Sequence, residues 1–363
     1  GGFACAHNGN LTNSMSLKKK LVESGSIFQT TSDTEVILQL VARSKKNKLI
    51  EKLIDALFQI QGAYSLVILT NKKLIGVKDP YGIRPLVLGK KKGSYVLASE
   101  TCALNMIGAK FVRDIENGEI VIITEDGVES VKPFKKVRER PCIFERIYFA
   151  SPESIVGGKT VYTYRKALGK ELSLENNINA DVIVPIPDSG VSAAIGYSQA
   201  SKIPFELGII RSHYVGRTFI EPSQSIRQFG VKLKHSVNKS CIENKKVILI
   251  DDSIVRGTTA NKIVKMVFEA GAKEVHLGIS CPPIKYPDFY GIDTPNFNEL
   301  MASNNDIEVM TKLVGATSLF FLSLNGTYKA MGCDTRNEQF PQFTDHCFTG
   351  EYPVDVSELL KNK

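Results

Sequence analysis

The sequence predicts two domains, an α+β domain followed by an α/β domain with a mostly parallel sheet. A chain of 363 residues is long enough for two hydrophobic cores. Its first part places helically spaced apolar residues before short strand-like stretches separated by turns. After about Val137, strand-like and helical stretches alternate, which is typical of a parallel sheet covered on both faces. We therefore expect domains of residues 1–137 and 138–363, the second with a carboxyl-terminal extension.

The first domain is predicted to pack helices on an antiparallel sheet. Apolar residues follow helical spacing from Leu11 to about Gly62. The segment SDTE, at Ser32 to Glu35, has the sequence of a capping box and predicts the start of a helix there. Four apolar stretches separated by turn sequences then predict hairpin strands. These stretches are AYSLVILT, KLIGVK, YVLAS and EIVIIT.

The second domain is predicted to contain parallel strands that alternate with helices. Its strand candidates are DVIVPIP (181–187), FELGII (205–210), VILID (247–251) and EVHLGIS (274–280). Open parallel sheets bind ligands at the carboxyl ends of their strands. We therefore expect functional side chains just after these stretches.

Composition limits the class of protein and of partner. The chain is 43% hydrophobic and 23% charged, with a net charge of +8, which favours anionic partners. A small anionic substrate fits this balance as well as a nucleic acid does. The seven cysteines are far apart and form no CxxC pair, so the reducing cytosol is expected rather than a disulfide framework or a zinc ribbon. We find no signal sequence and no apolar run long enough to span a membrane.

The strand VILI delivers two adjacent carboxylates, Asp251 and Asp252, to the binding edge of the sheet. The following Gly257 to Thr259 supplies a tight bend, backbone N–H groups and hydroxyls at a helix start, which suit a phosphate. Acidic side chains beside such a cradle suit sugar hydroxyls or Mg²⁺. The alternative is that Asp251 to Ser253 only cap the next helix. That alternative does not explain two acids, an arginine and GTT together.

The segment VILIDDSIVRGTT resembles the phosphoribosyl pyrophosphate motif of type I phosphoribosyltransferases. More narrowly, the chain is similar to the glutamine-dependent amidophosphoribosyltransferases over nearly its whole length. The segments that carry this resemblance are AHNGNLTN, TTSD, DPYGIRPLVLG, CIFERIYFASPES, VPIPDSGVSAAIGY, YVGRTFIEPSQSIRQFGVKLK and YPDFYGIDTP.

The resemblance implies an incomplete Ntn-type αββα sandwich, a class II glutamine amidotransferase domain, followed by a type I phosphoribosyltransferase domain. It implies the first committed step of purine synthesis, from phosphoribosyl pyrophosphate, glutamine and water to 5-phosphoribosylamine, glutamate and pyrophosphate. Mg²⁺, purine nucleotide inhibitors, a homo-oligomer and a cytoplasmic location are implied as well. No membrane or nucleic-acid partner is expected.

By the same resemblance, Ser189 in PDSG, together with Asp251 and Asp252, would hold Mg²⁺. The alternative for Ser189 is an ordinary helix cap. The resemblance also implies a set of residues that bind phosphoribosyl pyrophosphate. This set is Asp251, Asp252, Ser253, Arg256, Gly257, Thr258, Thr259, Tyr214, Arg217 and Thr218.

A long basic connection precedes the VILID stretch. From Arg211 to Lys239 it holds six Lys or Arg residues and one acid, Glu221. Connections of this length are usually functional. We expect a lid that closes over the polyphosphate, with Tyr214, Arg217 and Thr218 at the substrate. A solvated surface loop and a nucleic-acid contact are the alternatives, but no RNA-binding signature accompanies this charge.

The resemblance gives Asn8 and the Gly9 N–H the role of an oxyanion hole for glutamine hydrolysis, and gives Asp33 the glutamine amino group. The alternative for Asn8 and Gly9 is a hairpin turn. The alternative for Asp33 is the first turn of a helix. In this class the nucleophile is a cysteine at the mature amino terminus. Gly1 stands first here, so we expect the chain as printed not to hydrolyse glutamine and to use free ammonia.

Some members of the family carry an iron–sulfur cluster on four cysteines. Cys142 and Cys347 match two of these positions, but Asp288 and Thr344 stand at the other two. Clusters need cysteine-rich ligation, so we expect none.

Two other classes of function use parts of the same sequence pattern. A salvage phosphoribosyltransferase lacks the AHNGNLTN and TTSD regions. A regulator that senses phosphoribosyl pyrophosphate needs a nucleic-acid module, and none is evident.

Overall fold

The computed structural model describes residues 2–211, 235–292, 294 and 296–360, which form two compact units. Unit 1 contains Gly1–Phe144, Pro287–Asn296 and Asn337–Lys363, and unit 2 contains Glu145–Tyr286 and Phe297–Arg336. Unit 1 therefore includes two segments from late in the chain. None of the described helices is long and apolar enough to cross a membrane.

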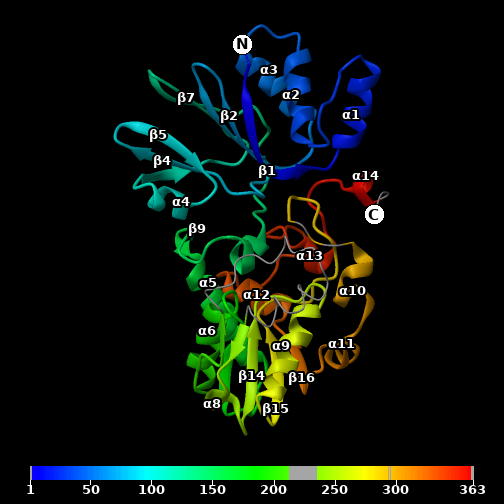
Figure 1. The fold of residues 1–363 in the computed structure, drawn as a ribbon. Coiled ribbons are helices and arrows are strands. Elements are labelled where there is room, and N and C mark those ends of the chain that lie inside the picture. The colour runs from blue at the N-terminus through cyan, green and yellow to red at the C-terminus, as the bar shows by residue number, and fades with distance from the viewer. Residues whose placement is uncertain (1, 212–234, 293, 295, 361–363) are drawn as a thin grey trace. The chain divides into compact units, whose positions relative to one another are not determined.

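Unit 1 is an α+β fold with two antiparallel sheets (Figure 1). The larger sheet has the strand order β1-β2-β3-β7-β8 and the smaller has the order β5-β4-β6. The strands are β1 (Ala4–Leu11), β2 (Gly62–Leu69), β3 (Leu74–Lys78), β4 (Val87–Lys91), β5 (Ser94–Ala98), β6 (Lys110–Asp114), β7 (Ile120–Thr124) and β8 (Gly127–Val131). The helices are α1 (Ser14–Glu23), α2 (Thr34–Arg43), α3 (Leu49–Leu57), α4 (Thr101–Met106), α13 (His346–Thr349) and α14 (Ser357–Leu360).

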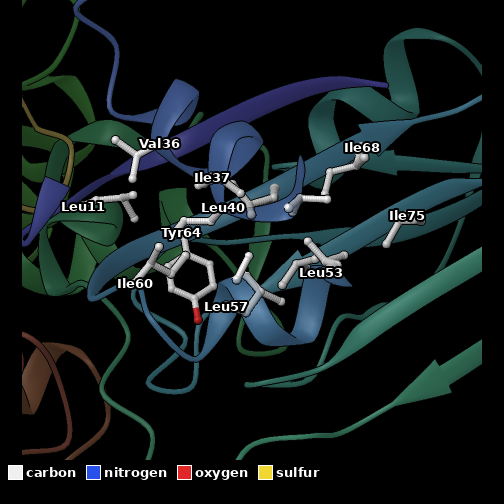
Figure 2. Close-up of a cluster of buried hydrophobic side chains, with 14 of the residues drawn as sticks. Leu11, Val36, Ile37, Leu40, Leu53, Leu57, Ile60, Tyr64, Ile68 and Ile75 are labelled. Carbon is white, nitrogen blue, oxygen red and sulfur yellow. The ribbon is translucent and has the colours of Figure 1, made fainter. Parts of the chain in front are cut away.

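The main core of unit 1 lies between α2, α3 and the larger sheet (Figure 2). Helix α2 buries the face that its apolar spacing predicts, with Ile37 fully inaccessible to solvent. Leu53 and Leu57 of α3 pack into the same cluster as Ile68 and Ile75 of the sheet. The predicted arrangement of helices on an antiparallel sheet is therefore confirmed.

The predicted capping box at Ser32 to Glu35 is wrong in its contacts. Helix α2 does begin there, but its N-cap is Asp33, which makes no side-chain capping bond. The Glu35 carboxylate instead accepts bonds from the Gln29 and Thr30 backbone N–H groups, each over 2.8 Å. Glu35 therefore binds the backbone of the preceding loop at Gln29 and Thr30, and does not cap the N-terminus of the helix.

Unit 2 is an α/β fold around a parallel sheet with the order β11-β14-β15-β16. Figure 1 shows α9 beside this sheet. The strands are β9 (Ile155–Val156), β10 (Lys159–Thr160), β11 (Val182–Pro185), β12 (Ile209–Arg211), β13 (His235–Val237), β14 (Lys246–Asp251), β15 (Glu274–Ile279) and β16 (Ser318–Phe321). The helices are η1 (Glu145–Phe149), α5 (Val161–Glu175), α6 (Val191–Ser201), α8 (Lys239–Ile242), α9 (Thr258–Glu269), η3 (Phe297–Glu299), α10 (Met301–Asn304), α11 (Ile307–Val314) and α12 (Leu324–Ala330).

Three of the four strand candidates lie in the parallel sheet, but FELGII does not form a full strand of it. Its backbone pairing with the sheet is limited to an isolated bridge between Phe205 and Ile183, with the Glu206 N–H donating to the Ile183 oxygen over 2.9 Å. The end of FELGII forms β12, which pairs with β13 in an antiparallel hairpin. The fourth parallel strand is β16, whose short SLFF sequence was not recognised as a strand.

Candidate active sites

Asp251 and Asp252 lie at the carboxyl end of β14, as predicted. Four buried residues, Val247 to Ile250, carry the chain through the middle of the sheet to this edge. Burial raises the pKa of both carboxyl groups, and the charge of Asp252 raises that of Asp251 further. Two adjacent carboxyl groups at this edge therefore favour a cation between or beside them.

The PDSG turn lies beside these carboxylates. The Ser189 hydroxyl donates to Asp251 Oδ1 over 3.1 Å. Gly190 allows this approach, because a β-carbon there would lie 2.1 Å from the backbone oxygen of Ile250. The Ile186 N–H donates to the same oxygen over 2.9 Å. The structure thus brings Ser189 and Asp251, which are 62 residues apart, to one strand edge.

Gly257 forms the bend before α9, with φ of 75° in the left-handed region that favours glycine. Thr258 and Thr259 form the exposed first turn of that helix, where N–H groups lack partners within the helix. This local structure has the bend and the helix start that the predicted anion cradle requires, and the binding of phosphate there stays a prediction.

Two further predicted substrate ligands already have protein partners. Ser253 donates its hydroxyl to Asp252 Oδ1. Arg256 donates its Nε to Glu299 over 2.7 Å, in an exposed ion pair. Either side chain would exchange that partner on binding substrate. The remaining predicted ligands, Tyr214, Arg217 and Thr218, lie outside the described residues.

A buried cation that sequence reasoning missed lies behind the acidic pair. Arg165 of α5 donates to the backbone oxygens of Tyr148 and Ala150, each over 2.7 Å. Its charge lowers the pKa of Asp252, against the larger effect of burial. The sequence offered no signal, because an arginine within a helix is usually exposed.

Asn8 and Gly9 lie within β1 and not in a hairpin turn, so the turn alternative is wrong. They pair in register with Ser65 and Tyr64 of β2. Gly9 has φ of 140°, and a β-carbon there would lie 2.0 Å from the Ala63 oxygen. Glycine is required here because the backbone of the neighbouring strand occupies the space of a side chain.

The Asn8 side chain is held at both ends. Its Oδ1 accepts from Arg84 Nε over 3.1 Å and from Arg84 Nη2 over 3.0 Å. Its Nδ2 donates to Ser99 Oγ over 3.2 Å. Arg84 lies within DPYGIRPLVLG, and the sequence predicts no role for it, because its distance of 76 residues from Asn8 hides the contact.

Asp33 lies close to the same strand. Its carboxylate accepts from the Leu11 N–H over 2.8 Å and lies 3.6 Å from His7 Nδ1. Burial alone would raise the pKa of Asp33, but the contacts with His7 and Leu11 outweigh burial and lower it. An ionised carboxylate here suits an ammonium group of a ligand.

Comparison with known proteins identifies both units. Residues 1–106 match the family described as glutamine amidotransferase domain, and residues 163–289 match the family described as phosphoribosyl transferase domain. The amidophosphoribosyltransferase of Rhizobium etli is 56% identical over 373 aligned residues, which cover 100% of this chain and 75% of that protein. This chain belongs to the amidophosphoribosyltransferase family.

The chain is also similar to other amidophosphoribosyltransferases. That of Bacillus subtilis is 46% identical, with 98% of this chain and 75% of that protein covered. A solved B. subtilis structure, described as glutamine phosphoribosylpyrophosphate amidotransferase complexed with ADP and GMP, has a TM-score of 0.92. It covers 98% of this chain and 78% of that one. The match spans both units. It therefore argues against the two alternative functions, a salvage phosphoribosyltransferase and a regulator that senses phosphoribosyl pyrophosphate.

Two of the four positions that the family resemblance assigns to iron–sulfur ligands hold other residues here, Asp288 and Thr344. Buried Cys142 forms a backbone bridge with Thr344, and buried Cys347 follows three residues later. The Asp288 carboxylate lies 2.8 Å from His346 Nε2. Asp288, which pairs with His346, and Thr344 both lack a thiolate. They do not fit a cluster that needs cysteine ligands. The absence of a cluster stays a prediction.

Proposed function

We propose that this chain transfers the phosphoribosyl group of phosphoribosyl pyrophosphate to ammonia, which hydrolysis of glutamine by water supplies when the nucleophilic cysteine is present. The bond between the anomeric carbon and the pyrophosphate oxygen breaks, and a bond from that carbon to ammonia nitrogen forms with loss of a proton. The products are 5-phosphoribosylamine, pyrophosphate and glutamate. This is the first committed reaction of purine synthesis, and it makes the chain a pentosyltransferase.

The arrangement at the end of β14 supports the transferase half of this proposal. Asp251 and Asp252 would bind the ribose hydroxyls, and Gly257 to Thr259 would bind the 5′-phosphate through backbone N–H groups and hydroxyls. The predicted lid residues Tyr214, Arg217 and Thr218 would seal the site, and Ser253 and Arg256 would contact the substrate after leaving their present partners.

Mg²⁺ fits the donor set at this edge. Asp251, Asp252 and Ser189 offer oxygen atoms only, which Mg²⁺ prefers. Among the described residues, no group of three or more His, Cys, Asp or Glu side chains could hold a metal ion. Mg²⁺ is commonly held by one or two carboxylates plus substrate oxygens, so we propose that substrate completes its coordination. When bound, the ion would neutralise charge on the departing pyrophosphate.

The arrangement on β1 supports the glutamine half. Asn8 Nδ2 and the Gly9 N–H would donate to the oxyanion that forms when a thiolate nucleophile adds to the glutamine amide carbon. The ionised Asp33 carboxylate would bind the glutamine ammonium group. These roles are carried over from the family onto matching residues.

Regulation and assembly are part of the same proposal. The B. subtilis relative was solved in complex with ADP and GMP, which supports the binding of purine nucleotides, the expected inhibitors, by this chain. We infer a homo-oligomer and a cytoplasmic location, the latter because all seven cysteines are free of disulfides.

The observation that carries the transferase proposal is the convergence of Ser189 with the adjacent carboxylates of Asp251 and Asp252. Ammonia-dependent, Mg²⁺-dependent release of pyrophosphate tests it. Asp251→Asn with Asp252→Asn should reduce this rate by at least about a hundredfold, because two charged ligands are lost. Asp126→Asn, which removes an exposed turn carboxylate, is the control. Equal rates in the double variant and the control would refute the proposal.

A further inference from the structure

Arg84 holds the carboxamide of Asn8 in a two-pronged hydrogen bond. Both guanidinium donors end on one atom, Asn8 Oδ1, over 3.1 Å and 3.0 Å. Arg84 has only 3% of its surface exposed. Buried, charge-assisted bonds of this kind are strong and geometrically specific.

This contact decides which way the Asn8 amide faces. The oxygen and nitrogen of an amide are otherwise difficult to tell apart, but a guanidinium has donors and no acceptor. The atom that faces Arg84 must therefore be the oxygen. The amide nitrogen then lies on the other side, where one N–H donates to Ser99 Oγ. The second N–H remains available as a donor.

Arg84 is itself anchored by the strand opposite Asn8. Its backbone oxygen accepts from the Ser65 hydroxyl over 3.0 Å, and Ser65 is the register partner of Asn8. The preceding turn is closed by the fully buried Asp79. That carboxylate accepts from the Tyr81 and Ile83 N–H groups, each over 3.0 Å. The base of the arginine is thus held by a buried network before its side chain reaches Asn8.

We propose that Arg84 is a positioning residue for glutamine hydrolysis, which fixes the Asn8 amide with its N–H directed at the developing oxyanion. The inference rests on the proposed function of Asn8. In that step a thiolate forms a bond to the glutamine amide carbon, and the carbonyl electron pair moves to oxygen. The oxyanion then re-forms the carbonyl, the C–N bond breaks, and nitrogen leaves as ammonia after gaining a proton. Water next adds to the resulting thioester, the C–S bond breaks, and glutamate and the thiol are released.

The positive charge of Arg84 has a second effect on the same donor. A guanidinium bonded to the amide oxygen draws electron density away from the amide nitrogen, which makes its N–H a stronger donor. Arg84 therefore acts through Asn8 and does not need to touch glutamine.

Kinetics of the protein with the nucleophilic cysteine at its mature amino terminus separate this role from a structural one. In Arg84→Met, we expect kcat with glutamine to fall about a hundredfold, near the loss of one oxyanion donor. The KM for glutamine and the ammonia-dependent rate should stay within about twofold of wild type, because only the transition state is affected. Arg84→Lys keeps the positive charge but lacks the paired guanidinium donors. Its kcat with glutamine should be about tenfold higher than that of Arg84→Met.

The matched control is Arg113→Met, which removes another forked arginine of unit 1, bound to Glu119. It should leave kcat with glutamine unchanged. An Arg84→Met variant with wild-type kcat would overturn the inference. So would equal losses of the glutamine- and ammonia-dependent rates, since those indicate general damage to the fold.

A second measurement does not depend on catalysis. The Asn8 side-chain NH₂ signals, assigned by their loss in Asn8→Asp, should show slow exchange with water in ¹⁵N spectra. In Arg84→Met they should exchange at least about tenfold faster, because the amide can rotate. Equally fast exchange in wild type and variant would overturn the positioning role. If the wild-type signals exchange slowly but the protein does not hydrolyse glutamine, the proposed function of Asn8 is contradicted. The fixed orientation of the Asn8 amide by Arg84 would still be supported.

Discussion

The Asp288 carboxylate lies 2.8 Å from the His346 imidazole, and both side chains are buried. Asp288 also accepts from the Tyr290 N–H over 2.7 Å and the Ile292 N–H over 2.8 Å. This pair joins the two late segments of unit 1, 287–296 and 337–363. By the family resemblance, Asp288 stands at a position where some members are expected to carry a cluster cysteine.

We predict that Asp288→Asn destabilises unit 1 at neutral pH. The change removes the carboxylate that the buried His346 ring nitrogen faces, and disturbing a buried polar pair in this way costs about 1 to 3 kcal/mol. For a unit of this size, that corresponds to a fall in Tm of roughly 5 °C, measured by thermal scanning. Glu243→Gln, which breaks the exposed Lys239 pair, is the control and should change Tm by less than about 2 °C.

The same pair should show a defined pH dependence. Burial alone would raise the pKa of Asp288, but His346 and the two backbone N–H groups outweigh it and lower the pKa. Stability from a lowered carboxyl pKa is complete above the unfolded value, about 4, and is lost as pH falls through the folded value. The Tm difference between wild type and Asp288→Asn should therefore narrow below about pH 4. A difference that widens with acidity would contradict this account.

Asp79 should have the opposite effect on stability. Burial raises its pKa from 3.8 to about 6, despite the bonds from Ile83 and Arg84 N–H groups. Between these values the folded chain binds a proton that the unfolded chain does not, so stability rises as pH falls from about 6 to about 4. Two pKa units correspond to about 3 kcal/mol. Asp79→Asn should remove this part of the stability curve measured against pH, and Asp126→Asn should not. Parallel curves of stability against pH for wild type and Asp79→Asn would exclude this contribution of Asp79.

The sequence predicted those parts of the fold and site that depend on local patterns. The helices of unit 1, three strands of the parallel sheet and the edge position of Asp251 follow from apolar periodicity and turn residues. The β16 strand was missed because SLFF is too short to show a period. The contacts of Arg84 with Asn8 and of Asp288 with His346 join residues 76 and 58 positions apart, and no local pattern reports such distances.

Gly257 and Gly315 form a matched pair of left-handed glycines in unit 2. Their φ angles are 75° and 74°, so alanine at either position should cost about 1 kcal/mol of stability. A β-carbon at Gly257 would also lie 2.3 Å from Met301 Cε, a flexible end that can move. Only Gly257→Ala disturbs the first turn of α9, where the phosphate would bind. It should raise the KM for phosphoribosyl pyrophosphate about tenfold in the ammonia-dependent assay. Equal KM values in Gly257→Ala and Gly315→Ala would count against the cradle.

Asp251→Asn should make the metal-free protein more stable while it abolishes the response to Mg²⁺. Burial and the neighbouring Asp252 charge raise the pKa of Asp251, so its ionised form is costly at neutral pH without a cation. Removing that charge should raise Tm in Mg²⁺-free buffer by a few degrees, about 1 kcal/mol.

In wild type, Mg²⁺ with phosphoribosyl pyrophosphate at about a hundred times Kd should stabilise the folded state by about 2.7 kcal/mol. Asp251→Asn should lose this increase in Tm, and Asp126→Asn should retain it. The reason is that the two adjacent negative charges repel each other when no cation is bound. The same charges attract Mg²⁺ when it is present. A variant with lower Tm in Mg²⁺-free buffer, or with an undiminished ligand shift, would show that Asp251 serves the fold and not the metal.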